Sequence, residues 1–125
     1  MAETTRSGGC LCGAVRYHLR GEPLTAGLCH CADCRKVTGS AFLHYADWHL
    51  YQFSTTGEVR SYAGRSFCPQ CGSHLFNKGD EKVEIHLGTL DDAPSDIRPL
   101  VEGWAKRRER WLPILAGTPM FPADP

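Results

Sequence analysis

Two segments of the chain alternate apolar and polar residues with the period of a β-strand. Over residues 14–20, Val15, Tyr17 and Leu19 alternate with charged and polar residues, and residues 82–87 repeat this pattern. Successive side chains of a strand point to opposite faces, so both segments are predicted to be strands that bury one face. Shorter strand candidates, bounded by glycine and other turn residues, lie at 41–46, 58–63, 65–67 and 74–77.

A single short helix is predicted at residues 32–37, and it ends before the turn residues Thr38-Gly39-Ser40. The 13 glycines and 8 prolines speak against a helical bundle. We therefore predict a mainly β fold with one short helix. A chain of 125 residues fits one domain, which we place at residues 8–119, with a flexible N-terminus at 1–7 and a C-terminal tail at 120–125.

Two tryptophans, Trp104 and Trp111, flank a basic run at residues 106–110. In a helix their spacing would place both rings on one face, whereas in a continuous strand they would face opposite sides, and periodicity alone does not decide. Such large rings are more often core residues than a platform for a ligand. The basic run is more often a solvated face than a contact for a carboxylate or phosphate.

The net charge of the chain is zero, because it has 14 basic and 14 acidic residues. A net charge near zero gives no long-range attraction to nucleic acid or to an anionic membrane, so neither is an expected partner. Residues 1–9 lack the apolar core of a secretory signal, and no apolar run approaches the roughly 20 residues that span a bilayer. The expected location is cytoplasmic.

Seven cysteines are the unusual feature of the composition, and they fall into three groups. An odd number cannot pair completely within one chain, and no export signal points to an oxidising compartment. The groups are Cys10-Leu11-Cys12, Cys29-His30-Cys31-Ala32-Asp33-Cys34 and Cys68-Pro69-Gln70-Cys71. These short spacings let the sulfurs of one group bind the same metal ion.

The two cysteine pairs combine into a predicted four-thiolate site. If no group is divided, this is the only complete set of four, made of Cys10, Cys12, Cys68 and Cys71. Cys10 and Cys12 would point to the same face of an extended segment, and Gly72 can take the positive φ that a metal-binding turn often needs. Four thiolates favour zinc in a closed, structural site, with iron as the main competitor; buried structural cysteines or a redox pair are the alternatives.

The remaining group, Cys29, Cys31 and Cys34, is one ligand short of a closed tetrahedron. Three protein ligands with an open fourth position are typical of a catalytic zinc, and the alternative is that a nearby His or Asp completes the site. Cys34 falls in the first turn of the predicted helix, where free backbone N–H groups favour a thiolate. His30 would point away from its neighbouring cysteines if the segment is extended.

In combination, the motifs at Gly8–Tyr17, Cys29–Ser40 and Phe67–Ser73 resemble the glutathione-dependent formaldehyde-activating enzyme (GFA)/CENP-V family, and the likeness extends from Gly8 to Pro119. The resemblance implies curled antiparallel β-sheets and two zinc ions per chain. It assigns Cys10, Cys12, Cys68 and Cys71 to the structural ion and Cys29, Cys31 and Cys34 to an exchangeable, catalytic one. The family's reaction joins formaldehyde to glutathione, which forms S-hydroxymethylglutathione; in reverse it is a carbon–sulfur lyase.

Four residues are candidates for shaping a substrate pocket: Arg35, Lys36, Ser40 and Ser73. The alternative is that they serve as helix-end charges and turn hydroxyls. The chain departs from the family at Glu102-Gly103-Trp104, where many members carry a histidine before an aromatic residue. A carboxylate near the pocket would change the local charge and proton transfer, and close to glutathione it would repel the carboxylates of the substrate.

We therefore expect a zinc-dependent carbon–sulfur lyase that acts on a thiol–aldehyde adduct, with a small thiol such as glutathione as substrate. The alternative is a non-catalytic zinc module that binds a thiol compound, a protein or nucleic acid, as the many cysteines and the basic run suggest. The neutral net charge and the three-cysteine group argue against this alternative.

Overall fold

The structure is a computed structural model that describes residues 3–125, and in this range it contains ten strands and one α-helix. It divides into two units: unit 1 contains residues 3–25 and 46–96, and unit 2 contains residues 26–45 and 97–125. The strands are β1 (Thr5–Gly9), β2 (Arg16–Arg20), β3 (Thr25–Cys29), β4 (Leu43–His49), β5 (Phe53–Thr56), β6 (Arg60–Tyr62), β7 (Arg65–Phe67), β8 (His74–Lys78), β9 (Lys82–His86) and β10 (Val101–Gly103). The helices are α1 (Ala32–Thr38) and the short 3-10 helices η1 (Leu50–Gln52), η2 (Leu87–Thr89) and η3 (Ala105–Arg107).

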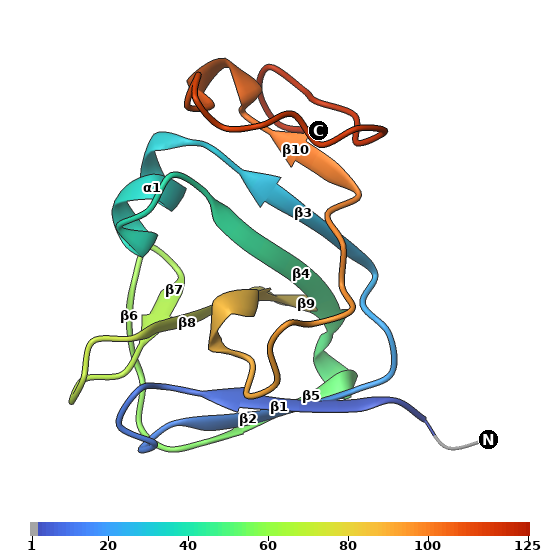
Figure 1. The fold of residues 1–125 in the computed structure, drawn as a ribbon. Coiled ribbons are helices and arrows are strands. Elements are labelled where there is room, and N and C mark those ends of the chain that lie inside the picture. The colour runs from blue at the N-terminus through green and yellow to red at the C-terminus, as the bar shows by residue number, and fades with distance from the viewer. Residues whose placement is uncertain (1–2) are drawn as a thin grey trace. The chain divides into compact units, whose positions relative to one another are not determined.

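Unit 1 consists of two groups of strands with aromatic side chains between them. β1, β2 and β5 form an antiparallel sheet in that order, and β9, β8, β7 and β6 form an antiparallel series in which β4 borders β9. Figure 1 shows β1, β2 and β5 on one side and β8 and β9 facing them. The ring of Phe76 lies 6.5 Å from that of Tyr17 and 5.1 Å from that of Phe53, which joins the two groups of strands in one apolar core.

Unit 2 is built around β3, which carries the second group of cysteines at its end. β10 pairs with β3 in parallel, with Val101 opposite Gly27 and Gly103 opposite Cys29, and β4 borders β3 on its other side. Gly27 is required here, because a Cβ would lie 2.7 Å from the Tyr45 hydroxyl and 2.9 Å from the Val101 carbonyl oxygen. The chain leaves β3 at Cys29 and enters α1 at Ala32, as Figure 1 shows.

The C-terminal tail of unit 2 is hydrogen-bonded to β10. The Glu102 N–H donates to the Pro119 carbonyl over 2.9 Å, and the Phe121 N–H donates to the Glu102 carbonyl over 2.9 Å. The Trp104 N–H donates to Ala123 in the same manner, over 2.9 Å. The predicted tail at 120–125 therefore includes residues that hold the edge of β10.

The mainly β class and the single α-helix are confirmed for the described residues, and each of the six segments predicted to be strands overlaps one. Four further strands, β1, β3, β5 and β10, were not predicted. Residues 5–7, expected to be part of a flexible N-terminus, form the first part of β1 because they pair with β2. The sheet of β1, β2 and β5 is antiparallel as expected, whereas the larger sheet is mixed because β10 runs parallel to β3.

The tryptophans lie in neither a long helix nor a continuous strand. Trp104 directly precedes η3, and Trp111 follows it in irregular chain and is 70% exposed. The interpretation of Trp111 as a core residue is therefore wrong, whereas Trp48, in β4, is fully buried. In the described part of the chain, no helix is both long enough and apolar enough to cross a bilayer.

Candidate metal centres

The cysteine sulfurs gather into the two groups that the spacing predicts. Unit 1 holds Cys10, Cys12, Cys68 and Cys71, unit 2 holds Cys29, Cys31 and Cys34, and the sulfurs within each group lie within 4.8 Å of one another. None of these cysteines is in a disulfide. Each group can therefore offer several sulfur ligands to one metal ion.

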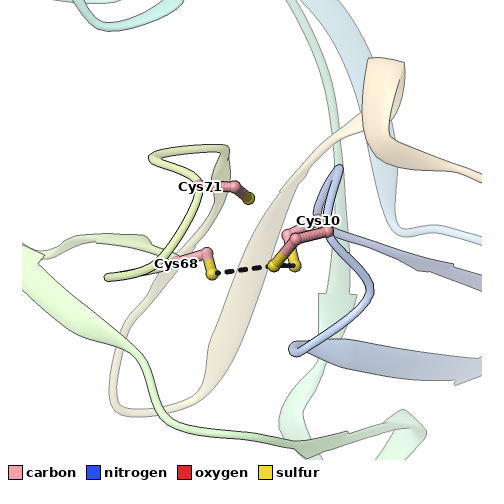
Figure 2. Close-up of side chains that lie close together, drawn as sticks. Cys10, Cys68 and Cys71 are labelled. Atoms are coloured by element: carbon pink, nitrogen blue, oxygen red, sulfur yellow. Dashed lines mark hydrogen bonds between the residues drawn. The ribbon is translucent and has the colours of Figure 1, made fainter.

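A turn brings together the first pair of sulfurs in unit 1. Cys10 follows β1, and the Gly13 N–H donates to the Cys10 carbonyl over 3.2 Å, which forms a turn. The prediction that Cys10 and Cys12 lie in an extended segment is therefore wrong. The turn still places the Cys10 and Cys12 sulfurs 3.6 Å apart. Figure 2 shows the Cys10 and Cys68 side chains pointing toward one another from separate loops.

The sulfur spacings of this group match a tetrahedral metal site. The Cys12 and Cys68 sulfurs lie 3.7 Å apart, close to the 3.6 Å between Cys10 and Cys12. Metal–sulfur bonds of about 2.3 Å in a tetrahedron place sulfurs about 3.8 Å apart, whereas a disulfide needs about 2.05 Å. Spacing and donor chemistry therefore fit a zinc ion held by four thiolates.

The second pair lies in the tight turn between β7 and β8. The Gly72 N–H donates to the Cys68 carbonyl over 2.9 Å, and Gly72 has φ +80°, which confirms the positive φ predicted for it. The Gln70 N–H donates to the Cys68 sulfur over 3.4 Å. In the other loop, the Val15 N–H donates to the Cys10 sulfur over 3.2 Å. Such N–H donors stabilise sulfurs in the thiolate form that binds metal.

Ser73 is part of this four-cysteine group. Its hydroxyl accepts the Leu11 N–H over 3.0 Å and lies 3.2 Å from the Cys71 sulfur. Hydrogen bonding from the Ser73 hydroxyl and then from its backbone N–H lowers the pKa of Cys71 to about 5. Ser73 thus connects the two cysteine loops and favours the thiolate form of Cys71.

The three cysteines of unit 2 lie where β3 leads into α1. Cys29 ends the strand, and Cys31 is the N-cap of the helix, with its sulfur accepting the Cys34 N–H over 3.2 Å. Hydrogen bonding from the Cys34 thiol, assisted by the Cys31 N–H, lowers the pKa of Cys29 to about 6 against the opposing effect of burial. The same interaction raises the pKa of Cys34.

No fourth His, Cys, Asp or Glu ligand atom joins the three sulfurs in the part of the chain that the structure describes. His30 lies between two of the cysteines, but it is fully buried and its Nε2 lies 2.8 Å from Glu102 Oε1. This confirms the prediction that His30 points away from the sulfurs. His44 of unit 2 is also outside the group, and burial lowers its pKa.

Glu102, the residue that departs from the family pattern, is completely buried. Its Oε1 accepts the Arg108 Nε–H over 3.0 Å as well as the contact from His30. The carboxylate charge is therefore balanced by a guanidinium whose side chain is only 8% exposed. Arg108 also shows that the basic run is not wholly a solvated face.

The candidate pocket residues have well-defined partners or positions. The Arg35 guanidinium donates to the Arg107 carbonyl over 2.9 Å and pairs with Glu109. The Ser40 hydroxyl donates to the Phe42 carbonyl over 2.7 Å, as a turn hydroxyl does. Lys36 is exposed on α1. Arg35, Lys36 and Ser40 belong to unit 2 with the three cysteines, whereas Ser73 belongs to unit 1.

Sequence reasoning named His30 and Glu102 separately but missed that they form one buried set with Arg108. His30 and Glu102 are 72 positions apart, and β10, which carries Glu102, was not predicted. The one available signal was the charged residue Glu102 beside Val101 and Gly103 in a short apolar stretch. A buried charge of this kind requires a partner elsewhere in the fold.

The chain resembles known proteins in sequence and in fold. Over 74 residues the chain is 31% identical to an uncharacterized lyase of Schizosaccharomyces pombe, a match that covers 55% of this chain and 54% of that protein. The chain thus spans about half the length of this curated relative. The crystal structure of a Rhodobacter sphaeroides protein shares the fold, with a TM-score of 0.56 and 20% identity over 92% of this chain and 99% of that one. Residues 5–107 match the sequence model of the family described as glutathione-dependent formaldehyde-activating enzyme, and the chain belongs to that family.

Proposed function

We propose that the chain is a zinc-dependent carbon–sulfur lyase that acts on a thiol–aldehyde adduct such as S-hydroxymethylglutathione. The observation that carries this proposal is the group Cys29, Cys31 and Cys34, whose three sulfurs lie together with no fourth His, Cys, Asp or Glu ligand atom among the described residues. Membership of the family and the lyase name of the S. pombe relative support the same class of reaction.

The two cysteine groups divide the work in this proposal. Cys10, Cys12, Cys68 and Cys71 would hold a closed, structural zinc ion, because four thiolates saturate it. Cys29, Cys31 and Cys34 would hold a second ion with one position open, which makes it the more readily removed of the two. This second zinc ion would supply Lewis acidity that favours the thiolate of a substrate or polarises a carbonyl.

The reaction needs no covalent bond to the protein. In the forward direction the glutathione sulfur bonds to the formaldehyde carbon, and the thiol proton moves to the carbonyl oxygen, which becomes the hydroxyl group of the adduct. In the lyase direction the carbon–sulfur bond breaks and the hydroxyl proton returns to sulfur. The protein's part is to bind the adduct beside the three sulfurs and to orient it.

Charge on α1 and around the cysteine groups provides candidates for substrate binding. Lys36 is exposed two residues after Cys34 and offers its ammonium group to a substrate carboxylate. Arg35, Ser40 and Ser73 stay proposals, and the partners of Arg35 and Ser40 favour a supporting role. Glu102 is buried and paired with Arg108, so its charge is not presented to a glutathione carboxylate at the surface of unit 2.

The test is proton exchange between glutathione and S-hydroxymethylglutathione, followed by NMR with zinc-loaded protein. Catalytic amounts of the protein are expected to accelerate exchange, and Cys34→Ala is expected to abolish this effect while one zinc ion per chain is retained. Lys36→Ala is expected to raise KM with little change in kcat, and Lys78→Ala, an exposed lysine of β8, is the matched control. Exchange that the wild-type protein leaves unchanged would refute the proposed reaction, and glutathione binding without exchange would favour a non-catalytic thiol-binding module.

A further inference from the structure

Glu102 is a fully buried carboxylate with two charged or polar partners on different parts of unit 2. Its Oε1 accepts the Arg108 Nε–H over 3.0 Å and lies 2.8 Å from His30 Nε2. A carboxylate can only accept hydrogen bonds, so Nε2 is the protonated nitrogen of His30. One oxygen of Glu102 thus connects the chain around Arg108 to the residue between Cys29 and Cys31.

The backbone of Glu102 is fixed on both sides, so its carboxylate is presented from a rigid position. Glu102 lies opposite Leu28 in the parallel pairing of β10 with β3. Its N–H donates to the Pro119 carbonyl, and its carbonyl accepts the Phe121 N–H, each over 2.9 Å. Arg108 is fixed as well, because it donates to the carbonyls of Leu112 over 2.8 Å and Pro113 over 2.6 Å.

His30 receives support from three directions. Its backbone N–H donates to the Gly103 carbonyl over 3.1 Å, its ring bonds Glu102, and the same ring lies 5.7 Å from that of Phe42. Because His30 is the single residue between Cys29 and Cys31, fixing its backbone and side chain limits how far either neighbouring sulfur can move. This restraint reaches the sulfurs through the chain, without a direct contact.

A second connection restrains the other end of the cysteine group. Arg35 follows Cys34 directly in α1, and its guanidinium donates to the Arg107 carbonyl over 2.9 Å and pairs with Glu109. The side chains of Arg35 and Glu109 are 29% and 33% exposed. Residues 102–109 therefore contact the segment that carries Cys29, Cys31 and Cys34 at two points, which are His30 within it and Arg35 directly after it.

We propose that Glu102 and Glu109 are positioning residues, which hold His30 and Arg35 so that Cys29, Cys31 and Cys34 keep the spacing needed to bind a metal ion. The inference deepens the proposed function and rests on its assignment of an ion to these three cysteines. A site held ready for the ion binds it more tightly, because less ordering is required on binding. Groups that orient ligands in this way typically change metal affinity by about 10–100-fold when they are lost.

The test is a measurement of metal affinity at each cysteine group, with no dependence on activity. Zinc is titrated away with a chromophoric chelator, and Co²⁺ substitution reports the sulfur geometry through its visible absorption bands. In Glu102→Ala, we expect the affinity of the three-cysteine group to fall by about 10–100-fold while the four-cysteine group is unchanged. Glu102→Gln keeps an oxygen that can accept from both His30 and Arg108, so it is expected to restore affinity and the Co²⁺ spectrum close to wild type.

Two further variants keep the test decisive. Removing a buried charge partner can unfold a protein, so Glu109→Ala, which changes a partly exposed residue, tests the second connection with less risk and is expected to weaken the same group alone. Asp47→Asn is the matched control, because Asp47 is a buried carboxylate of unit 1 that faces Lys82 and is not part of this arrangement.

The outcomes separate the two proposals. Wild-type protein that binds two ions, with affinities that Glu102→Ala and Glu109→Ala leave unchanged, would overturn the positioning role and leave the proposed function intact. Equal weakening of both cysteine groups would also overturn it, since it would indicate general destabilisation. Wild-type protein that binds one ion, with Cys29, Cys31 and Cys34 reacting as free thiols, would overturn both.

Discussion

At the scale of single residues, buried polar groups in the two units meet different surroundings. Glu102 of unit 2 is balanced by Arg108 and His30, so its burial leaves no isolated charge. His86 of unit 1, at the end of β9, is 5% exposed, and His74 and Arg65 act on it electrostatically. Burial beside such positively charged or ionisable groups favours the neutral imidazole.

His86 should therefore make the stability of the protein depend on pH. Burial, assisted by His74 and Arg65, lowers the pKa of His86 from 6.5 to about 4. The unfolded chain then binds the proton more readily, so this contribution is complete above pH 6.5 and is lost as pH falls toward 4. We expect the loss to be about 3 kcal/mol at most, and to be absent in His86→Gln.

The measurement is the free energy of unfolding by denaturant between pH 4 and 7 for wild type and His86→Gln. Acid also weakens metal binding by thiolates, but both proteins share that effect, and the difference between their slopes isolates His86. His18→Gln, at an exposed position of β2, should keep the wild-type slope. Parallel curves for wild type and His86→Gln would contradict the prediction.

The cysteine groups were predictable at this scale because short covalent spacing defines the three groups, and joining the two pairs is the only way to make a set of four without dividing a group. The two pairs and the group of three gather in space as their spacing indicates. The contact between His30 and Glu102 was not predictable, since these residues are 72 positions apart and nothing in the local sequence indicates that they meet. Long-range pairs of this kind depend on strand order, which a single sequence does not specify.

At the scale of elements, α1 depends on the glycine that ends it. Gly39 is the C-cap with φ 63° and ψ 28°, and its N–H bonds the Arg35 carbonyl over 2.8 Å. A side chain in this left-handed conformation is strained even though a Cβ would have no atom within 4 Å. We expect Gly39→Ala to lower the free energy of unfolding by about 1–2 kcal/mol.

Gly88→Ala is the matched control for this prediction. Gly88 lies in η2, also has no atom within 4 Å of a built Cβ, and does not have the left-handed φ of Gly39. Alanine at such a site restricts the unfolded chain and is expected to be neutral or stabilising by up to about 1 kcal/mol. Chemical denaturation of both variants provides the comparison, and equal losses would show that the backbone conformation at Gly39 is not responsible.

Strands with a clear alternation could be predicted from the sequence, and strands without one could not. β2 buries every second side chain, and β9 buries Val83 and Ile85 in the same alternation, which is the signal that identified both, although His86 at the end of β9 is buried as well. β3 is buried at three successive positions, Ala26, Gly27 and Leu28, so no alternation marks it. β1 contains no apolar residue, and β10 has three residues whose pairing is with β3, far away in the sequence.

At the scale of the whole molecule, the chain crosses between its two units three times, and each unit contains one cysteine group. The single domain expected at residues 8–119 stays a prediction, and the sequence gives no sign of the two units because neither is continuous in the chain. The cysteine groups also differ in their sequence separation. Cys12 and Cys68 are 56 positions apart, whereas Cys29, Cys31 and Cys34 lie within one short segment.

This difference predicts how loss of each site affects stability. By the chain-entropy argument for a cross-link, an ion that joins Cys12 to Cys68 restricts the unfolded chain by about 4 kcal/mol, against about 2 kcal/mol for a loop of about five residues. With zinc bound at both groups, Cys68→Ser should therefore lower the free energy of unfolding by about 2 kcal/mol more than Cys34→Ser. Serine keeps the size of each side chain, so the two variants are matched in chemistry.

Chelation of the wild-type protein tests the same difference without a mutation. An ion at the four-cysteine group would be enclosed by four sulfurs and would link the loop after β1 to the β7–β8 turn, so its removal and the loss of tertiary structure should coincide. The three-cysteine ion should leave at lower chelator concentration with the fold retained, as measured by zinc release and near-UV circular dichroism in one titration. If the protein unfolds as the first ion is released, the two groups stabilise the fold equally. The same conclusion would follow if Cys34→Ser lowered the free energy of unfolding as much as Cys68→Ser.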